Sequence, residues 1–438
     1  MSVRRTALTA LVDITDNGAY ANLRLKEALN GLEERDAAWV NAAVYTALDN
    51  LIYIDYVLGA FVKGRQNPGI RGILRLGVCQ LLFMRVPASA ACNESVKLAK
   101  EIGKGALSGL VNGVMRNVAR AAENGTLPAL PEDVNERLSV KYSWPLYIVN
   151  EYVNEYGAEF TEAMLAYSGH GMTVRAQYPY TSEALVKWLD ESGRGYERGK
   201  LVEDAFKLFG GMDVSNAEPF LSGKLAVQSE SAMLACRALG LSGGERVLDA
   251  CAAPGGKSAY IASLLKNDCA ITAWDIHQHR VELMTNTFKR LNVTSAAAER
   301  RDASIYHDEF LATFDAVLVD APCSGLGVTG KPDARYQKSD GIIMGLAELQ
   351  HSILSACCRY IRPGGTLVYS TCTVSKRENG AQISAFLNEH KDFAADGEGL
   401  CAMLPEGVSK RVENGAVQLF PHIDGTEGFF IARLKRKV

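Results

Sequence analysis

The 438-residue sequence has no long apolar run and no recognisable export signal. Its most apolar segment, residues 73–84, contains Arg75 and Gln80 and is far shorter than the roughly 20 residues that a membrane span needs, so we expect a buried helix there. The N-terminus places two arginines before apolar residues, but Asp13 interrupts them and no small-residue cleavage site follows. We therefore expect a cytoplasmic protein without a membrane partner.

The sequence also lacks the cysteine spacing of a zinc site or a disulfide scaffold. Its 10 cysteines include no C-x-x-C pair, so we expect reduced thiols and no bound metal. The net charge of −3 provides no overall attraction for nucleic acid, so any contact with nucleic acid must come from local basic residues. Each candidate could equally belong to a solvated helix face. These candidates are Arg71, Arg75, Arg116, Arg120, Lys435, Arg436 and Lys437.

Three segments with different patterns follow one another along the chain. Apolar residues recur at helical spacing through residues 1–125, which predicts an all-α domain. Residues 126–228 begin in a proline-bearing linker and mix short helices with strand-like stretches, which indicates a small α+β module. In residues 229–438 strands alternate with helices, and this pattern is typical of a doubly wound, Rossmann-like α/β domain.

A glycine-bearing turn between a strand and a helix is the first candidate binding site of the α/β domain. Small side chains let the backbone approach a ligand, and the helix start offers free N–H groups. The spacing differs from that of a Walker loop, and such a turn is as often structural as functional. The turn consists of Cys251, Ala252, Ala253, Pro254, Gly255, Gly256 and Lys257.

Two aspartates strengthen the prediction of a nucleotide pocket. Asp275 ends the next strand, at the position where an acidic side chain binds ribose hydroxyls in nucleotide-binding α/β folds. Asp302 follows the third strand and could bind an adenine amino group, although a solvated turn residue is an equally good interpretation. These features alone fit NAD and S-adenosylmethionine equally well.

Two cysteines follow apolar strands of the same predicted sheet. Cys323 lies in the sequence DAPCSG and Cys372 in STCTV, so both are expected at one edge of the sheet. A free cysteine is usually a small buried apolar residue. Two of them at successive strand ends beside a nucleotide pocket instead indicate thiol chemistry.

Together, DACAAPGGK, DAPCSG and STCTV resemble the signature of the Nop/Sun family of RNA cytosine-5 methyltransferases. The N-terminal sequences LRLGVCQLLFMRVP, NESVKLAK and GLVNGVMRNVAR resemble the NusB-like, RNA-binding domain of bacterial members that act on 16S ribosomal RNA. The resemblance implies S-adenosylmethionine as the methyl donor and 16S rRNA as the partner. We expect a monomer.

The same resemblance assigns roles to four residues. Cys372 would be the nucleophile that adds to C6 of cytosine, and Cys323 would help to remove the C5 proton and release the product. Asp320 would hydrogen-bond the base, assisted by Lys257, and we also count both among the donor-binding residues. For Lys257 the alternative is a solvated residue at a helix start, but a cation is unfavourable at that end of the helix dipole.

Other interpretations stay open at this stage. The motifs report the type of reaction, so the target could be transfer RNA. The chain could also be a non-catalytic RNA-binding or assembly factor, although retention of both cysteines, Asp320 and the glycine turn speaks against it. Residues 331–336 depart from the arginine-rich, tryptophan-bearing pattern usual in the family, which could alter how the RNA strand is held, and Glu427 stands where aspartate is common.

Overall fold

In a computed structural model, the described part of the chain is residues 2–64, 66–169, 171–209, 214, 216–328, 332–337 and 339–438. It forms two compact units, one of Met1–Ala166 with Gly330–Ser339 and one of Tyr167–Thr329 with Asp340–Val438. The sequence suggested a first boundary near residue 125, whereas the helices that follow pack into the first unit up to Ala166. Whether the three expected segments act as separate domains stays a prediction.

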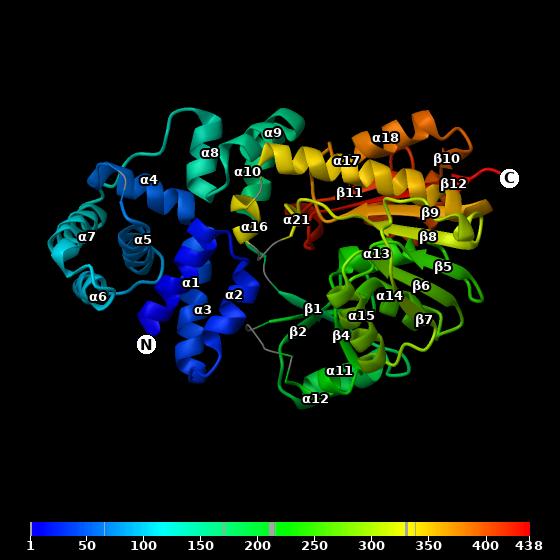
Figure 1. Ribbon diagram of the computed structural model, residues 1–438, viewed down its shortest axis with the longest axis horizontal. Coiled ribbons are helices and arrows are strands. Elements are labelled where there is room, and N and C mark those ends of the chain that lie inside the picture. Colours follow the sequence, from blue (N-terminus) through cyan, green and yellow to red (C-terminus); the bar gives the residue numbers. More distant parts are fainter. Residues whose placement is uncertain are drawn as a thin grey trace. The chain divides into compact units, whose positions relative to one another are not determined.

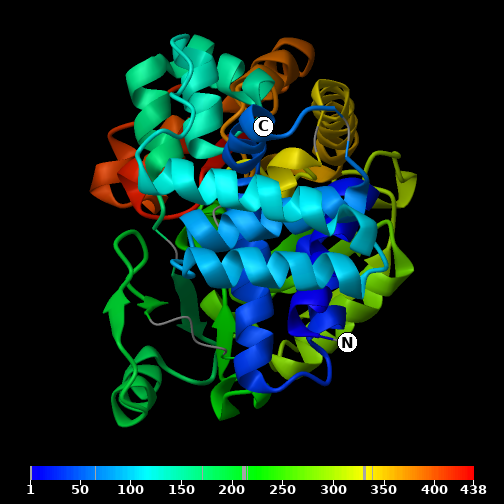
Figure 2. The same cartoon turned by 90° about the vertical axis from the view of Figure 1, so that its left-hand side faces the viewer.

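The first unit is all helical, as the apolar spacing predicted. Helix α5 (Pro68–Leu82) shows why: Asn67 caps its first turn by accepting from the Gly69 N–H at 3.0 Å, and Pro68 occupies the first helical position. Its apolar side chains are buried among those of neighbouring helices, and α5, α6 and α7 lie side by side in Figure 2. The other helices are α1 (Val3–Asn17), α2 (Ala21–Leu29), α3 (Glu34–Asp49), α4 (Leu51–Phe61), α6 (Ala88–Glu101), α7 (Ser108–Glu123), α8 (Val134–Tyr142), α9 (Leu146–Tyr156) and α10 (Ala158–Ala166).

A short helix from far along the chain completes this unit. In α16 (Pro332–Tyr336) the buried Asp333 accepts a hydrogen bond from the Ala21 N–H at 3.0 Å, at the start of α2. Arg335 pairs with Asp49, and the Tyr336 hydroxyl donates to the Leu48 carbonyl at 2.8 Å. The departure of residues 331–336 from the family pattern was expected to alter how the RNA strand is held, and this stays a prediction. In the structure Asp333, Arg335 and Tyr336 have partners within the helical unit, and Lys331 lies outside the described residues.

The second unit begins with a small antiparallel sheet in the strand order β2-β3-β1-β4. This sheet lies within residues 126–228, for which the sequence indicated a small α+β module, whereas the helices between residues 134 and 166 belong to the first unit. The buried Arg175 of β1 lies over the Tyr260 ring, at 4.7 Å from its centroid, and thereby joins this sheet to the α/β domain. The elements are β1 (Met172–Ala176), α11 (Ser182–Glu191), β2 (Tyr196–Arg198), β3 (Ala205–Leu208), α12 (Glu218–Leu221) and β4 (Leu225–Val227).

The α/β domain is a Rossmann-like sheet with helices on both faces, as expected (Figure 1). Strands β7, β6, β5, β8 and β9 are neighbours in that order and run parallel. Strands β12, β10 and β11 extend the sheet antiparallel, which the sequence did not predict. The strands are β5 (Arg246–Asp249), β6 (Ala270–Asp275), β7 (Ala296–Arg300), β8 (Phe314–Asp320), β9 (Ile361–Thr371), β10 (Phe393–Ala395), β11 (Ala416–Leu419) and β12 (Phe429–Arg436).

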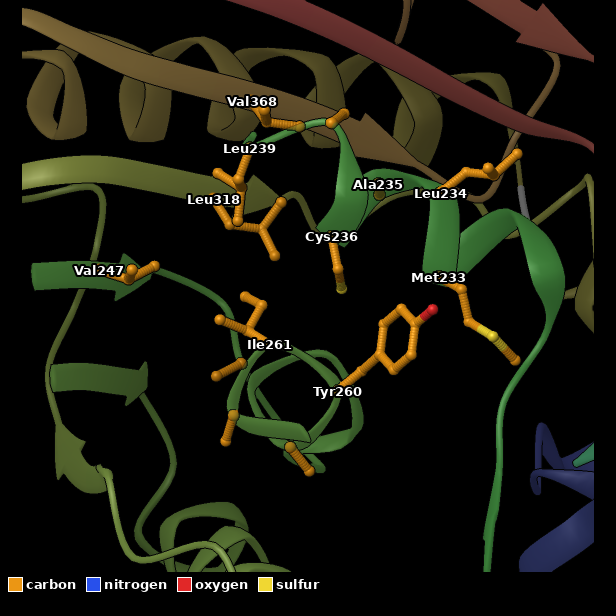
Figure 3. Packing of buried hydrophobic residues seen from close by; sticks show 14 of the residues in the cluster. Met233, Leu234, Ala235, Cys236, Leu239, Val247, Tyr260, Ile261, Leu318 and Val368 are labelled. Carbon is orange, nitrogen blue, oxygen red and sulfur yellow. The ribbon is translucent and has the colours of Figure 1, made fainter. Parts of the chain in front are cut away.

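Helices α13 to α15 cover one face of this sheet, and α17 and α18 cover the other (Figure 1). Figure 3 shows the first of these layers, in which Cys236 of α13 and Ile261 of α14 meet Val247 and Leu318 from the strands. Such apolar burial is the main stabilising contribution to the domain. The helices are α13 (Glu230–Arg237), α14 (Gly256–Leu264), α15 (Gln278–Arg290), α17 (Asp340–Cys357), α18 (Gly380–Glu389), α19 (Gly397–Met403), α20 (Glu406–Ser409) and α21 (Pro421–Asp424).

The most apolar long helix differs from the one that the sequence suggested. In the described part of the chain, only Asp340–Tyr360, which includes α17, is long and apolar enough to span a membrane, judged by length and composition alone. Core helices of globular proteins pass the same test, and α17 buries Ile343, Ile353 and Leu354 within its unit. Residues 73–84 lie in α5 and its C-terminal end and are largely buried, as expected.

Several basic residues suggested as RNA contacts have partners within their own units. Arg75 is 7% exposed and donates twice to Asp55, at 2.8 and 2.6 Å, and Arg71 pairs with Asp16. The three basic residues near the C-terminus also have partners. Lys435 donates to Thr366, Arg436 donates to the Ile361 carbonyl and pairs with Asp392, and Lys437 donates to the Lys391 carbonyl. Arg116 and Arg120 are exposed on α7. These two therefore remain the candidates for phosphate contacts.

Replacing Asp333 with alanine should destabilise the helical unit, because the Ala21 N–H at the start of α2 then loses its acceptor. We expect a loss of about 1 kcal/mol, typical of a helix cap, and faster hydrogen exchange across α2. Asp133→Ala is the matched control, since Asp133 caps α8 by accepting from the Glu136 N–H at 2.9 Å. Exchange in α2 that stays at the wild-type rate in Asp333→Ala would contradict the role of α16 in this unit.

Candidate active site

The candidate residues gather because three neighbouring strands end at one edge of the sheet. Parallel pairing aligns β5 with β8 and β8 with β9. Backbone hydrogen bonds continue past the strand ends, from the Ala250 N–H to the Leu318 carbonyl at 2.9 Å and from the Ala321 N–H to the Ser370 carbonyl at 2.9 Å. The segments that follow β5, β8 and β9 therefore lie next to one another.

The glycine turn connects β5 to α14. Gly255 has φ of +96°, a left-handed conformation that favours glycine, and a Cβ atom there would lie 2.9 Å from the Phe288 ring. The start of α14 is attached to the end of β5, because the hydroxyl of the buried Ser258 donates to Asp249 at 2.6 Å. The turn is tied to the next strand because the Ala252 N–H donates to the Trp274 carbonyl at 2.8 Å. The first N–H groups of α14 are thus held beside the ends of β5 and β6.

Asp275 and Asp302 lie at the same edge of the sheet. The Asp275 carboxyl group accepts from the His277 N–H at 2.9 Å, and Arg280 pairs with it at 3.5 Å. The Arg301 N–H donates to the Asp275 carbonyl at 3.1 Å, which brings the loop that carries Asp302 to the end of β6. Asp302 itself caps a turn through Ser304. Asp302 Oδ1 thus stabilises this turn, which lies next to the end of β6.

Lys257 and Asp320 form an ion pair across the strand ends. The Lys257 Nζ lies 2.6 Å from Asp320 Oδ2 and 5.6 Å above the Phe429 ring. Burial alone would lower the pKa of Lys257, but the charge and hydrogen bond of Asp320 more than offset burial and raise it. Asp320 Oδ1 accepts from the Ser370 hydroxyl at 2.8 Å. Lys257 is therefore a charged partner of Asp320 and not a solvated residue at a helix start.

The two thiols face each other beside this ion pair. The Sγ atoms of Cys323 and Cys372 are 3.2 Å apart, and the Cys372 N–H donates to Cys323 Sγ at 3.3 Å. The hydrogen bond with Cys372, together with burial, raises the pKa of the Cys323 thiol well above its ordinary value. A thiol with a raised pKa is the stronger base once it has lost its proton. Both side chains are half-buried, so a ligand can reach them.

Sequence reasoning missed several residues that complete this arrangement. Ser370 and Ser324 lie inside the recognised motifs, so their positions next to the candidate residues were the available signal. Phe429, under the Lys257 ammonium group, lies in the unpredicted strand β12. Glu378 and Gln350 are buried and bonded to each other at 3.0 Å, although both residue types are usually exposed. Nothing in the sequence pattern distinguished these two.

The arrangement combines a thiol pair, a carboxyl group held by an ammonium group, and a strand edge suited to an adenosyl ligand. Thiols serve as nucleophiles and as proton carriers, and a buried carboxyl group can hydrogen-bond a polar ring. The glycine turn and Asp275 are placed as in folds that bind a ribose at this edge. This combination suits group transfer to a ring that must first be attacked by a thiol.

Comparison with known proteins identifies the family. Residues 236–435 match the family described as 16S rRNA methyltransferase RsmB/F, and residues 1–120 match the NusB family. The "Probable ribosomal RNA small subunit methyltransferase B" of Bacillus subtilis is 39% identical, with 100% of this chain and 99% of that protein covered. The protein of the same description from Synechocystis is 33% identical, with both chains covered to 100%.

Solved structures agree with this assignment. A methyltransferase homologue from Pyrococcus horikoshii is 26% identical and superposes with a TM-score of 0.58, over 70% of this chain and 100% of that one. The relatives from Bacillus subtilis and Synechocystis match the whole chain, so their similarity extends over both the helical unit and the α/β domain. The chain therefore belongs to the RsmB/F family of S-adenosylmethionine-dependent RNA methyltransferases and carries a NusB-family domain at its N-terminal end.

Proposed function

We propose that the protein methylates carbon 5 of a cytosine in 16S ribosomal RNA, with Cys372 as the covalent nucleophile. The observation that carries the proposal is the contact between the two thiols, 3.2 Å apart, next to the Lys257–Asp320 pair. Neither thiol alone would distinguish this chemistry from that of an ordinary buried cysteine. Two thiols in contact at the strand ends of a methyltransferase domain provide one group to attack and a second to carry a proton.

The methyl donor fits the edge of the sheet formed by the glycine turn, Asp275 and Asp302. The absence of side-chain bulk at Gly255 and the N–H groups at the start of α14 suit close approach of the donor's polar groups. Asp275 would accept from ribose hydroxyls and Asp302 from the adenine amino group. When bound, S-adenosylmethionine supplies an electrophilic methyl group.

The protein's own groups would then act in sequence. The Cys372 thiolate adds to C6 of cytosine, and the ring becomes electron-rich at C5, which takes the methyl group. Asp320 accepts a hydrogen bond from the amino group of the ring and orients it, while Lys257 keeps Asp320 in place and brings a positive charge near the ring as negative charge develops on it. Cys323, as the thiolate, accepts the C5 proton. The electrons of the C5–H bond form the C5–C6 double bond while the bond between Cys372 and C6 breaks, which releases the methylated base and the Cys372 thiolate.

The identity of the RNA rests on the relatives and on the helical unit. The curated relatives are described as methyltransferases of ribosomal RNA of the small subunit, and residues 1–120 match the NusB family. We infer that the helical unit binds the same RNA, with Arg116 and Arg120 on α7 as phosphate contacts. The reacting base must leave its stack to reach Cys372, so a single-stranded or loop cytosine is the expected target in the cytoplasm.

The decisive test uses 16S rRNA, labelled donor and cysteine variants. Cys372→Ala should lower 5-methylcytosine formation by more than about a thousandfold, because no other group adds to C6. Cys323→Ala should accumulate a denaturation-resistant protein–RNA adduct, because the C5 proton is then not removed. Mapping 5-methylcytosine in total RNA from cells with and without the protein would locate the target nucleotide.

The exposed Cys401 provides the control, since Cys401→Ala should keep wild-type activity. An adduct that still forms in Cys372→Ala would reverse the assignment of the two thiols. Donor binding without methylation of any RNA would contradict the proposed function.

The Lys257–Asp320 pair makes a separate prediction. Asp320→Asn should reduce the methylation rate by about a hundredfold, because the ring loses its charged acceptor and burial then lowers the pKa of Lys257. Asp396→Asn is the matched control, since Asp396 pairs with Arg433 at 2.6 Å elsewhere in the domain. Single-turnover rates would measure both, and equal rates for the two variants would contradict a role for Asp320.

The proposed binding site for the methyl donor gives a further prediction. Asp275→Ala should weaken S-adenosylmethionine binding about tenfold or more, as expected for lost hydrogen bonds to a charged acceptor. The control is Asp268→Ala, because the exposed Asp268 precedes the opposite end of the same strand, β6. Calorimetry without RNA would measure both affinities. A wild-type affinity in Asp275→Ala would place the ribose elsewhere.

A further inference from the structure

Glu378 is a fully buried acid that the proposed chemistry does not use. It lies six residues after Cys372, in the loop between β9 and α18. Its carboxyl group accepts from the Ser324 N–H at 2.8 Å and from the Ser324 hydroxyl at 2.6 Å. Ser324 directly follows Cys323 in the chain. Glu378 thus connects the loop of one thiol to the loop of the other.

Gln350 of α17 holds the other side of Cys323. Its buried side-chain amide donates to the carbonyl of Pro322, the residue before Cys323, at 2.9 Å. The same amide donates to Glu378 at 3.0 Å. The residues before and after Cys323 are therefore each held by one buried polar side chain, and these two side chains are bonded to each other.

Two further contacts join the cysteine loops. The hydroxyl groups of Ser324 and Thr373, the residues that follow the two cysteines, are 2.9 Å apart. The Gly327 N–H donates to the Cys372 carbonyl at 3.0 Å. A Cβ atom at Gly327 would lie 2.0 Å from the Gly428 carbonyl oxygen, so the approach of these segments requires glycine there. The distance between the thiols is thus set by a connected network and not by packing alone.

A glutamate at position 378 is unexpected for stability alone. Transfer of its carboxyl group from water to the protein interior costs free energy, and an apolar side chain of similar size would fill the same space without that cost. A carboxyl group with all of its donors in place, however, fixes one geometry of the groups that it binds. What it fixes here is the backbone of Cys323.

We propose that Glu378, together with Gln350, is a positioning residue that holds Cys323 where it can take the C5 proton from the adduct on Cys372. This inference rests on the proposed function, because it requires the two thiols to have those separate roles. Proton transfer needs donor and acceptor within hydrogen-bond distance, so a small displacement of Cys323 slows it strongly. Addition by Cys372 does not require Cys323 in the same position.

The expected signature is therefore an adduct that forms but decays slowly. In Glu378→Gln, the amide can accept from only one of the two Ser324 donors, because its NH2 group faces the other. We expect multiple-turnover methylation to fall about tenfold, while adduct formation in the first turnover changes less than about twofold. The fraction of protein trapped on RNA at steady state should rise accordingly, towards that of Cys323→Ala.

The experiment uses the full-length chain, 16S rRNA transcribed in vitro and labelled donor, and follows adduct and released product over time. Ser324→Ala is the second variant, since it removes one hydrogen bond to Glu378 and leaves the buried carboxyl group in place. Glu230→Gln is the matched control, because Glu230 is also buried and accepts from the N–H groups of Leu201 and Val202 at 2.6 and 2.8 Å. Melting temperature and donor affinity are measured for every variant.

Trapping by Glu378→Gln and Ser324→Ala, with no trapping by Glu230→Gln, supports the inference. If Cys323→Ala traps the adduct but both variants turn over at the wild-type rate, Glu378 has no positioning role. If Cys323→Ala itself traps nothing, the division of labour between the thiols fails, and the inference fails with it. Should Glu378→Gln not fold, Ser324→Ala decides between the first two outcomes.

Discussion

Parallel pairing of β5, β8 and β9 is the constraint on which the candidate site depends. It places the chain after Asp249, after Asp320 and after Thr371 at one edge of the sheet, although these segments are about 50 to 120 residues apart in the sequence. No single segment contains both a thiol and its partner thiol. The chemistry is therefore a property of the sheet, and any change that shifts the register of β8 against β9 would separate the cysteines.

Buried polar groups then refine what the sheet brings together. The Lys257 ammonium group, the Asp320 carboxyl group and the Ser370 hydroxyl form one chain of hydrogen bonds above the strands. Glu378 and Gln350 form another, on the side of α17. Apolar packing of α13 and α14 below the sheet sets its position only approximately, because apolar contacts are not directional. The directional contacts supply the remaining precision.

The sequence predicted the residues whose type and place in a strand-turn pattern both indicate chemistry. Cys323, Cys372 and the turn around Gly255 belong to this group, and the structure gathers the first two with Lys257 and Asp320. Glu378 could not be predicted, because its partner Ser324 is 54 residues away and a glutamate before a helix usually faces water. The burial of Arg75 could not be predicted for the opposite reason. Its charge suggested a contact at the surface, whereas folding buries its side chain against Asp55.

The place of α16 in the helical unit has a consequence for synthesis on the ribosome. Domains generally fold in order of emergence from the N-terminus. Here the partners of Arg335 and Tyr336, Asp49 and Leu48, emerge almost 300 residues earlier. The first unit therefore lacks α16 while about half of the catalytic domain is translated. The helical unit thus acquires its last helix only after the loop that carries Cys323 has been synthesised.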